Sequence, residues 1–445
     1  MSAPASVRAN LSELWLLAWP VVVSRLGIMT MGLTDALVVG RYSAEQLGFL
    51  ALGWAPSAVV VTVAIGLLSG VQVMASRAIG EGKPRKAGAA LRRSLAYGLW
   101  IGVASAAFLA LTGPPFLHAM GLAPRLANGA SRVLIVFALS LPAFALLFVA
   151  ASWLEGLGRP KPAMTMMWLA NAVNLTVDLV LVPGHFGIPA LGAVGGGWAT
   201  FSSRTILAIA TLIYIARMPD ARALGVFDKP TRDRASEQAQ RRIGYGGGAS
   251  NLFEVASFAG MNIIAGWISA FTVAAYAVQN NIASLAFMVP LGFSTATAVL
   301  VGRAHGAGDA RALNRAALTG FAVVAVFGLT ISLLVWPAAG LIARAYTHQG
   351  ATVAMATSAL ALTCLFIVPD GLQVVIAQAL RARGDVLAPT MTHFVSYAVL
   401  MAPLAWFLAM PEHMGLNGII WAMIVASYLS AGLLLGRFWM LRKRA

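Results

Sequence analysis

Two stretches of the chain resemble each other and decide its fold. Residues 66–88 read GLLSGVQVMASRAIGEGKPRKAG, and residues 292–314 read GFSTATAVLVGRAHGAGDARALN. The offset between their residue numbers is 292 − 66 = 226, which we call the repeat offset. At this offset, without a gap, the matching residues are Arg77 and Arg303, Gly80 and Gly306, Gly82 and Gly308, Arg85 and Arg311, Gly158 and Gly384, and Gly192 and Gly418. Glycine turns recur wherever helices end tightly, but unrelated turns do not keep one register, so we predict two halves of the same fold.

Apolar runs fill most of both halves. Of the 445 residues, 59% are hydrophobic and only 10% are charged, whereas a soluble domain has about 25% charged residues. Runs of about 20 apolar residues, the length that crosses a bilayer as a helix, occur at about 14–40, 47–75, 94–113, 131–157, 162–183, 190–216, 243–268, 271–300, 317–342, 353–379, 388–410 and 415–438. The alternation typical of membrane barrels is absent. We therefore predict an all-α membrane protein with twelve transmembrane helices.

The basic residues predict its orientation. The net charge is +16, which in a soluble protein would suggest nucleic-acid binding. With a cytoplasmic N-terminus and alternating spans, however, 25 of the 31 Lys and Arg residues lie on the inner side. Four lie outside, and Arg25 and Arg204 fall within apolar runs. This positive-inside bias predicts a multi-pass protein of the cytoplasmic (inner) membrane with both termini in the cytoplasm, and no nucleic-acid partner.

The polar segment 217–242 separates the two sets of six runs. We interpret it as a cytoplasmic linker between an N-terminal lobe, residues 1–216, and a C-terminal lobe, residues 243–445. Because the repeat contains an even number of spans, the lobes insert in the same direction as parallel repeats, and a substrate cleft is expected between them.

Four acidic residues lie inside the predicted spans, where carboxylates usually mark ion or proton pathways. They are Asp35, Asp178, Glu254 and Asp370. Counted from Arg242 and Arg381 at about 1.5 Å per residue, Glu254 and Asp370 lie roughly 16 to 18 Å deep. Asp35 and Asp178 lie about 8 to 9 Å below the outer face by the same rise.

Asn174 precedes Asp178 by four residues and so shares its helix face. Such an oxygen-rich cluster suits Na⁺ or a transferable proton. Alternatively, the acids pair structurally with Arg25 and Arg204, but two bases cannot neutralise four acids. We interpret Glu155, at the inner end of the fourth span, as an interfacial helix-end charge. Trp54 is either an interface anchor, the commoner role, or a cleft wall.

These residues lie in segments that resemble the multidrug and toxic compound extrusion (MATE) family, in particular its NorM-like members, over nearly the whole chain. The matching segments are MGLTDALVVGRYS with Asp35, GLLSGVQVMASRAIGEG, NAVNLTVDLVLVPGHFGIPALGAVGGGWAT, SNLFEVASFAG with Glu254, and PDGLQVVIAQALRARGDVLAPT with Asp370. The resemblance implies a monomeric, lipid-embedded antiporter that exports cationic, amphipathic drugs in exchange for Na⁺ or H⁺ and needs no cofactor beyond that ion.

The resemblance also assigns roles residue by residue. Asp35, Asn174 and Asp178 take the ion or proton positions of the N-lobe, where Na⁺ could bind, and Thr200 joins them as a weaker match. Glu254 and Asp370 take the C-lobe positions and are candidate substrate contacts. The chain departs from the family at Ala277, where many members have a glutamine; Gln279 lies two residues further on.

Other functions remain open at this stage. A lipid-linked precursor flippase of the same superfamily would usually have additional spans and a cationic cavity. A membrane enzyme would need a nucleophile, base or metal constellation, and the sequence contains none that we recognise, so we predict a non-enzyme. A uniporter with purely structural acids would transport without an ion gradient.

Overall fold

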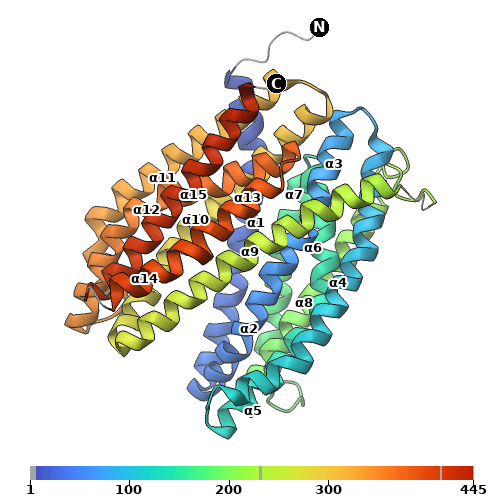
Figure 1. Cartoon of the computed structure of the whole chain (residues 1–445). Coiled ribbons are helices and arrows are strands. Elements are labelled where there is room, and N and C mark those ends of the chain that lie inside the picture. The colour runs from blue at the N-terminus through green and yellow to red at the C-terminus, as the bar shows by residue number, and fades with distance from the viewer. Residues whose placement is uncertain (1–6, 230–232, 411–412, 444–445) are drawn as a thin grey trace. The chain divides into compact units, whose positions relative to one another are not determined.

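The computed structural model describes residues 7–229, 233–410 and 413–443, and side chains within residues 10–442. This part of the chain is almost entirely helical (Figure 1). The elements are α1 (Val7–Tyr42), α2 (Ala44–Leu68), α3 (Gly70–Gly80), α4 (Pro84–Ala119), α5 (Pro124–Leu139), α6 (Leu141–Gly156), α7 (Pro160–Leu181), α8 (Ala193–Ala216), α9 (Arg234–Ile268), α10 (Ala270–Gly306), α11 (Ala310–Tyr346), α12 (Gly350–Arg383), α13 (Leu387–His393), the π-helix η1 (Phe394–Met401), α14 (Ala402–Ala409) and α15 (Gly415–Lys443).

The predicted all-α membrane fold is confirmed, and every predicted span coincides with one helix or with two or three consecutive helices. Ten helical stretches of the described chain are long and apolar enough to cross a bilayer. An eleventh is the pair α5 and α6, which meet at a bend of 43°. The seventh predicted span lies in α9, which has 35 residues but includes Glu254 and several glycines that lower its hydropathy. The number of spans therefore agrees approximately with the predicted twelve.

The sequence repeat is also a repeat of helix boundaries. Helix α2 begins at Ala44 and α10 at Ala270, which are separated by the repeat offset. Helix α4 begins at Pro84 and α11 at Ala310, with the same separation. The two halves therefore start these helices at matching positions.

Matching local interactions explain these shared boundaries. Ser43 and Ser269 are the N-caps of α2 and α10, and their hydroxyls accept hydrogen bonds from the backbone N–H three residues later, at 3.5 and 3.1 Å. Such caps satisfy N–H groups that lack partners within the helix. Gly82 and Gly308 have φ of +67° and +70°, a conformation that glycine adopts without a steric penalty.

The chain forms two compact units, which we describe separately. One is Val23–Gly248; the other combines the described residues of Met1–Val22 and Ala249–Ala445. The core of the first includes Trp153, whose indole N–H donates to the Ala87 carbonyl at 2.8 Å. The core of the second includes the edge-to-face pair Phe321 and Phe438, whose ring centroids are 5.2 Å apart. Each unit therefore has its own packed interior.

These units are bounded within helices rather than within the polar segment 217–242. Their boundaries fall inside α1 and α9. Residues 218–228 form a succession of turns, and α9 begins at Arg234, within the segment predicted as a linker. The division of the chain into functional lobes at 216 and 243 stays a prediction.

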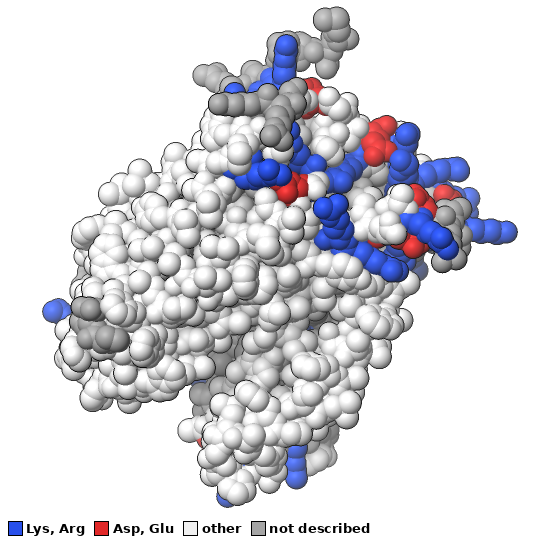
Figure 2. Space-filling model, in the orientation of Figure 1, with Lys and Arg blue, Asp and Glu red and all other residues white. Residues whose placement is uncertain are grey.

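Within each unit, charged side chains gather toward one end of its helices, and much of the remaining visible surface is uncharged (Figure 2). In the Val23–Gly248 unit this charged end includes the turn between α3 and α4 and the turns of residues 217–229, and we call it the basic end. Further along the helices, exposed side chains are apolar; Leu111 in α4 is 75% exposed and Leu341 in α11 is 72% exposed. Such a surface suits contact with lipid chains.

Candidate functional site

Three helices of the Val23–Gly248 unit bring together four of the predicted site residues. Helix α1 supplies Asp35, α7 supplies Asn174 and Asp178, and α8 supplies Thr200. The Thr200 hydroxyl donates a hydrogen bond to Asp35 Oδ2 at 3.0 Å. Asn174 and Asp178 lie beside the Asp35 carboxyl and interact with it. We call these four residues the Asp35 cluster.

Glycines at the start of α8 allow this cluster to form. A Cβ atom on Gly195 would lie 2.9 Å from the backbone carbonyl of Leu181 at the end of α7, so a side chain there would push the two helices apart. A Cβ atom on Gly196 would lie 3.6 Å from Asp178 Oδ1. The GGG motif therefore lets α8 approach α7 closely and place Thr200 near the acids.

The polar atoms of the Asp35 cluster are buried and only partly satisfied. Asp35 is 6% exposed, and Asn174 and Asp178 are fully buried. Asp35 Oδ1, both Asp178 carboxylate oxygens and the Asn174 amide make no hydrogen bond to the described residues. Two neighbouring ionised carboxylates repel each other, and burial without a partner is costly. A proton or a cation bound between them would lower this energy.

A cavity of about 330 Å³ adjoins the Asp35 cluster. Asp35 and Thr200 line it together with the aromatic side chains Trp54 and Phe137, whose ring centroids are 5.2 Å apart. Trp54, for which an interface anchor was the commoner interpretation, is thus a cavity wall. A cavity with apolar walls and a few polar groups is typical of a small-molecule site.

Arg204 of α8 also lines this cavity. Its guanidinium donates to the Ser140 hydroxyl at 2.7 Å and lies 5.8 Å from the centre of the Trp54 ring. It also interacts electrostatically with Asp35. The cavity is therefore lined by one positive charge, Arg204, and one carboxyl group, Asp35, which in turn interacts with the buried Asp178.

The second unit brings together the other two predicted acids. Glu254 of α9 is partly buried and Asp370 of α12 is 7% exposed, and the two interact electrostatically. Tyr397 of η1 is fully buried and interacts with both. Arg381, near the end of α12, is 4% exposed and interacts with Glu254. We call these four residues the Glu254 cluster.

Sequence reasoning missed two members of the Glu254 cluster. Arg381 served there as a cytoplasmic marker for the depth of Asp370, but it is buried and close to Glu254, so it does not mark the aqueous boundary. The repeat offset could have indicated the burial of Arg381, because it aligns Arg381 with Glu155, which lies inside the predicted span 131–157. The segment around Tyr397 gave no signal. Its π-helical turn, a feature frequent at functional sites, is visible only in the structure.

The interpretation of Glu155 as an interfacial charge is wrong. Its side chain is 4% exposed, and its carboxylate lies 3.7 Å from the guanidinium of Arg25, which is 15% exposed. The pairing arises because α1 and α6 present these residues to each other in the interior. Structural pairing therefore accounts for Arg25, and of the two in-span arginines only Arg204 lies by the predicted acids.

The glutamine displaced from the family position also points into the protein. Gln279 in α10 is fully buried, whereas Ala277 is exposed. The Gln279 amide makes no hydrogen bond to the described residues. The two-residue displacement thus places the glutamine on the opposite face of α10 from Ala277.

Comparisons with known proteins agree with this architecture. The model of the MatE family matches residues 20–180 and 248–407, one segment in each half. The starts of the two matches, at positions 20 and 248, are separated by nearly the repeat offset. Solved structures with the same fold include the eukaryotic MATE transporter AtDTX14, with a TM-score of 0.88 and 16% identity over 98% of this chain and 96% of that one. An outward-facing multidrug resistance MATE family transporter has a TM-score of 0.88 and 20% identity, covering 98% and 97%.

Relatives with named functions extend over nearly the full length. The probable multidrug resistance protein NorM of Caulobacter vibrioides is 59% identical over 435 residues, which cover 98% of this chain and 92% of that protein. The multidrug resistance protein PmpM of Pseudomonas aeruginosa is 30% identical over 416 residues, covering 93% and 87%. With the family model matched in both halves and these identities sustained along the chain, this protein belongs to the MatE family.

Proposed function

We propose that this chain is a multidrug antiporter that exports cationic, amphipathic compounds in exchange for Na⁺ or H⁺. The observation that carries the proposal is the Asp35 cluster, two buried carboxyl groups with unsatisfied oxygens at the edge of a cavity with aromatic walls. The names of the relatives, which are multidrug resistance proteins, support export of drugs over the lipid-linked precursor flippase.

The Asp35 cluster suits the coupling ion. Asp35, Asp178, Asn174 and Thr200 offer carboxylate, amide and hydroxyl oxygens, which are the ligands that hard cations prefer. The same carboxylates can instead take a proton. In either case the ion would fill the unmet bonding capacity of Asp178 and Asn174. The ion is a transported substrate here.

The neighbouring cavity suits a delocalised cation. Trp54 and Phe137 offer aromatic faces, which attract cations, and Asp35 offers a negative charge. The positive charge of Arg204 would promote release of the drug cation. With both Asp35 and Asp178 ionised, the three charges sum to one negative charge; with Na⁺ or a proton bound, the attraction disappears, and Arg204 opposes a second cation. Drug and ion therefore compete, and this competition gives each a different affinity for the loaded and unloaded protein.

The Glu254 cluster is the second candidate for ion or drug binding. Glu254 and Asp370 are close together, but Arg381 neutralises part of their charge. Arg204 interacts with Asp35 in a similar way, but the oxygen set around Asp35 also includes the Asn174 amide and the Thr200 hydroxyl. We therefore favour the Asp35 cluster for coupling and retain Glu254 and Asp370 as candidate substrate contacts.

The proposed setting is the cytoplasmic membrane, with the basic end and both termini in the cytoplasm and the chain acting as a monomer. The support is the excess of Lys and Arg in the predicted inner loops. Export would then move drugs away from the basic end.

Transport in proteoliposomes tests the proposal. The full-length protein is reconstituted, and ethidium movement is followed under a Na⁺ gradient at equal pH and, separately, under a pH gradient at equal Na⁺. We expect one gradient to drive ethidium against its concentration gradient, and anionic dyes to be transported poorly.

Asp220→Asn is the matched control because Asp220 is an acid of the basic end, half-exposed and paired with Arg159. It should transport as the unchanged protein does. Ethidium movement that is independent of both gradients would indicate a uniporter, and transport of anions alone would rule out the proposed substrate class.

A further inference from the structure

Two adjoining cavities lie at the basic end of the Val23–Gly248 unit. The first, of about 290 Å³, lies between the turn that joins α3 to α4 and the beginning of α9. The second, of about 520 Å³, follows α4 and α9 further along the helices. Arg93 of α4 lines both cavities. The two cavities therefore adjoin at Arg93, and we call them together the α4–α9 groove.

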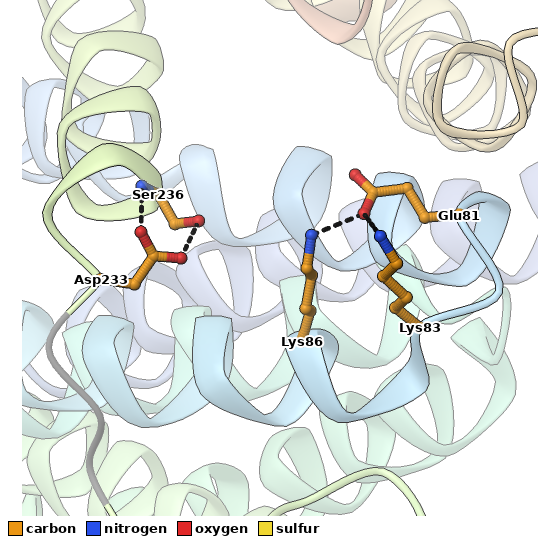
Figure 3. Close-up of polar contacts among 5 residues, drawn as sticks. All are labelled: Glu81, Lys83, Lys86, Asp233 and Ser236. Atoms are coloured by element: carbon orange, nitrogen blue, oxygen red, sulfur yellow. Dashed lines mark hydrogen bonds and ion pairs between the residues drawn. The ribbon is translucent and has the colours of Figure 1, made fainter.

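The upper part of the α4–α9 groove is strongly basic. Seven cations and four carboxylates line the two cavities. Two of these carboxylates already have partners (Figure 3). Glu81 binds Lys86 at 2.8 Å, and Asp233 accepts hydrogen bonds from the backbone N–H and hydroxyl of Ser236 at 3.1 and 2.6 Å. The excess of positive charge indicates an anionic ligand.

Arg93 and Arg241 are the two cations closest to the apolar part of the groove. Arg93 donates to Gln240 at 3.3 Å, which uses one of its five N–H groups. The Arg241 guanidinium lies 5.8 Å from the centre of the Tyr97 ring. Arg93 interacts electrostatically with Asp233 and Glu237, but among the described residues neither arginine forms an ion pair within 4.0 Å of a carboxylate. Both can therefore bind the oxygens of a phosphate, for which guanidinium groups are well shaped.

The lower part of the groove is apolar and aromatic. Leu67, Tyr97, Trp100 and Tyr245 line it. Trp100 is 66% exposed and Tyr245 is 55% exposed. Trp100 follows Arg93 by seven residues in α4, so it lies about 10 Å further along the helix. The lining thus changes from cationic at Arg93 to apolar at Trp100 over about 10 Å along α4.

We propose that the α4–α9 groove binds one anionic phospholipid. Its phosphate lies between Arg93 and Arg241, and its acyl chains lie along Leu67, Trp100 and Tyr245. Basic pockets between membrane helices recognise anionic headgroups in this way, and the aromatic side chains suit the membrane interface. The lipid would bridge α4 and the first turns of α9, and the proposal is independent of the transported drug or coupling ion.

The internal repeat supplies a comparison within the same chain. At the repeat offset, Arg92, Arg93, Tyr97 and Trp100 correspond to Leu318, Thr319, Val323 and Val326. The second half thus has α11 in the place of α4 but lacks both the arginine pair and the aromatic residues. This combination of arginine and aromatic side chains therefore does not follow from the repeated fold.

Native mass spectrometry of the purified full-length protein tests the site. The protein in neutral detergent is titrated with phosphatidylglycerol or with phosphatidylcholine of the same acyl chains. We expect retention of one phosphatidylglycerol at a concentration at least about tenfold lower than that needed for phosphatidylcholine. In Arg93→Gln, Arg241→Gln this preference should disappear, and in Arg93→Lys, Arg241→Lys, which keeps both charges, it should largely persist.

Arg222→Gln is the matched control, because Arg222 is an exposed arginine at the same end of this unit and lines neither cavity. It should retain the preference. Because Arg93 also bonds Gln240, the single variant Arg241→Gln, at an exposed position, keeps the test valid if the double variant is unstable; it should weaken phosphatidylglycerol retention severalfold. Equal retention of the two lipids by the unchanged protein, or an unchanged preference in Arg241→Gln and the double variant, would refute the site.

A competition experiment separates a lipid from a free anion. Inorganic phosphate is added in large excess to the protein loaded with phosphatidylglycerol. Because the acyl chains contact the apolar part of the groove, we expect the lipid to remain bound, and Trp100→Ala to weaken its retention. Displacement of the lipid by phosphate, with no effect of Trp100→Ala, would show a simple anion site and overturn the proposal.

Discussion

Glu155 and Arg381 occupy equivalent positions in the two halves, separated by the repeat offset, and carry opposite charges. Both are 4% exposed. Glu155 pairs with Arg25 of the first predicted span, and Arg381 interacts with Glu254 of the seventh, the corresponding helix of the second half. Each half therefore joins corresponding helices through an acid and a base, and the positions of the two charges are exchanged between the halves.

This exchange of charges explains why the Arg381–Glu254 pair belongs to a candidate site, the Glu254 cluster, whereas the Arg25–Glu155 pair does not. In the first half the acid at this position is held by Arg25, away from Asp35 and Asp178. In the second half the base occupies that position, so the acid, Glu254, lies on the partner helix and also interacts electrostatically with Asp370. Repeated backbones thus carry different charge arrangements.

Breaking the Arg25–Glu155 pair should destabilise the protein. Glu155→Gln leaves Arg25 in the interior without a charged partner, and removal of one member of a buried pair costs roughly 3 kcal/mol. We expect a clear fall in the thermal unfolding temperature in detergent. The exchanged variant Arg25→Glu, Glu155→Arg restores opposite charges and should recover part of the lost stability. If it unfolds at no higher a temperature than Glu155→Gln, the two side chains do not pair directly.

Arg381 and Glu254 should show energetic coupling. Arg381→Gln removes the positive charge beside two acids and should lower both thermal stability and efflux. When Glu254→Gln is added, the repulsion with Asp370 also disappears, so the double variant should be more stable than the sum of the two single losses predicts. Unfolding temperatures of the four proteins in this double-mutant cycle measure the coupling. Strict additivity would show that the two side chains act independently.

Neutralising the acids of the Asp35 cluster should abolish coupling. Asp35→Asn and Asp178→Asn keep the side-chain size but remove the charge and the titratable proton, and the amide is cheaper to bury than a carboxylate. We expect normal membrane insertion and loss of gradient-driven ethidium efflux in proteoliposomes at matched protein levels. Full efflux by the double variant would eliminate the Asp35 cluster as the coupling site and leave the Glu254 cluster.

The Thr200 hydroxyl should contribute through Asp35. Thr200→Val keeps the branched shape but removes the hydroxyl that bonds Asp35 Oδ2 and, with it, one of the oxygens proposed to bind Na⁺. We expect a weaker apparent affinity for Na⁺, by about tenfold, which corresponds to the roughly 1.5 kcal/mol of a hydrogen bond to a charged group. Thr211→Val is the control. Thr211 is also buried in α8, but its hydroxyl bonds only the Leu207 carbonyl of its own helix, and its loss should leave the ion affinity unchanged.

The topology can be tested with reporters at the chain ends. The distribution of Lys and Arg predicts that both termini are cytoplasmic. A reporter enzyme active only in the cytoplasm, fused after Arg444, should be active, and one active only outside should be silent. Activity of the external reporter at that position would reverse the orientation and with it the proposed direction of export.

The sequence by itself determined the features that depend on local composition or on register. Apolar runs identified the membrane helices because the cost of burying a polar group in lipid acts on each segment separately. One constant offset identified the repeat, and the spacing of four placed Asn174 and Asp178 on one face because the helix has a fixed pitch.

The tertiary structure alone decided which helix faces meet. The contact of Thr200 with Asp35 spans 165 residues of sequence, and the burial of Arg381, the pairing of Glu155 with Arg25 and the place of Trp54 in a cavity wall depend on similarly distant segments. Hydropathy and helical spacing contain no information about such contacts, because these contacts depend on how side chains of different helices pack together. A basic residue near a predicted span end therefore looked cytoplasmic in the sequence, and packing placed it beside an acid in the interior.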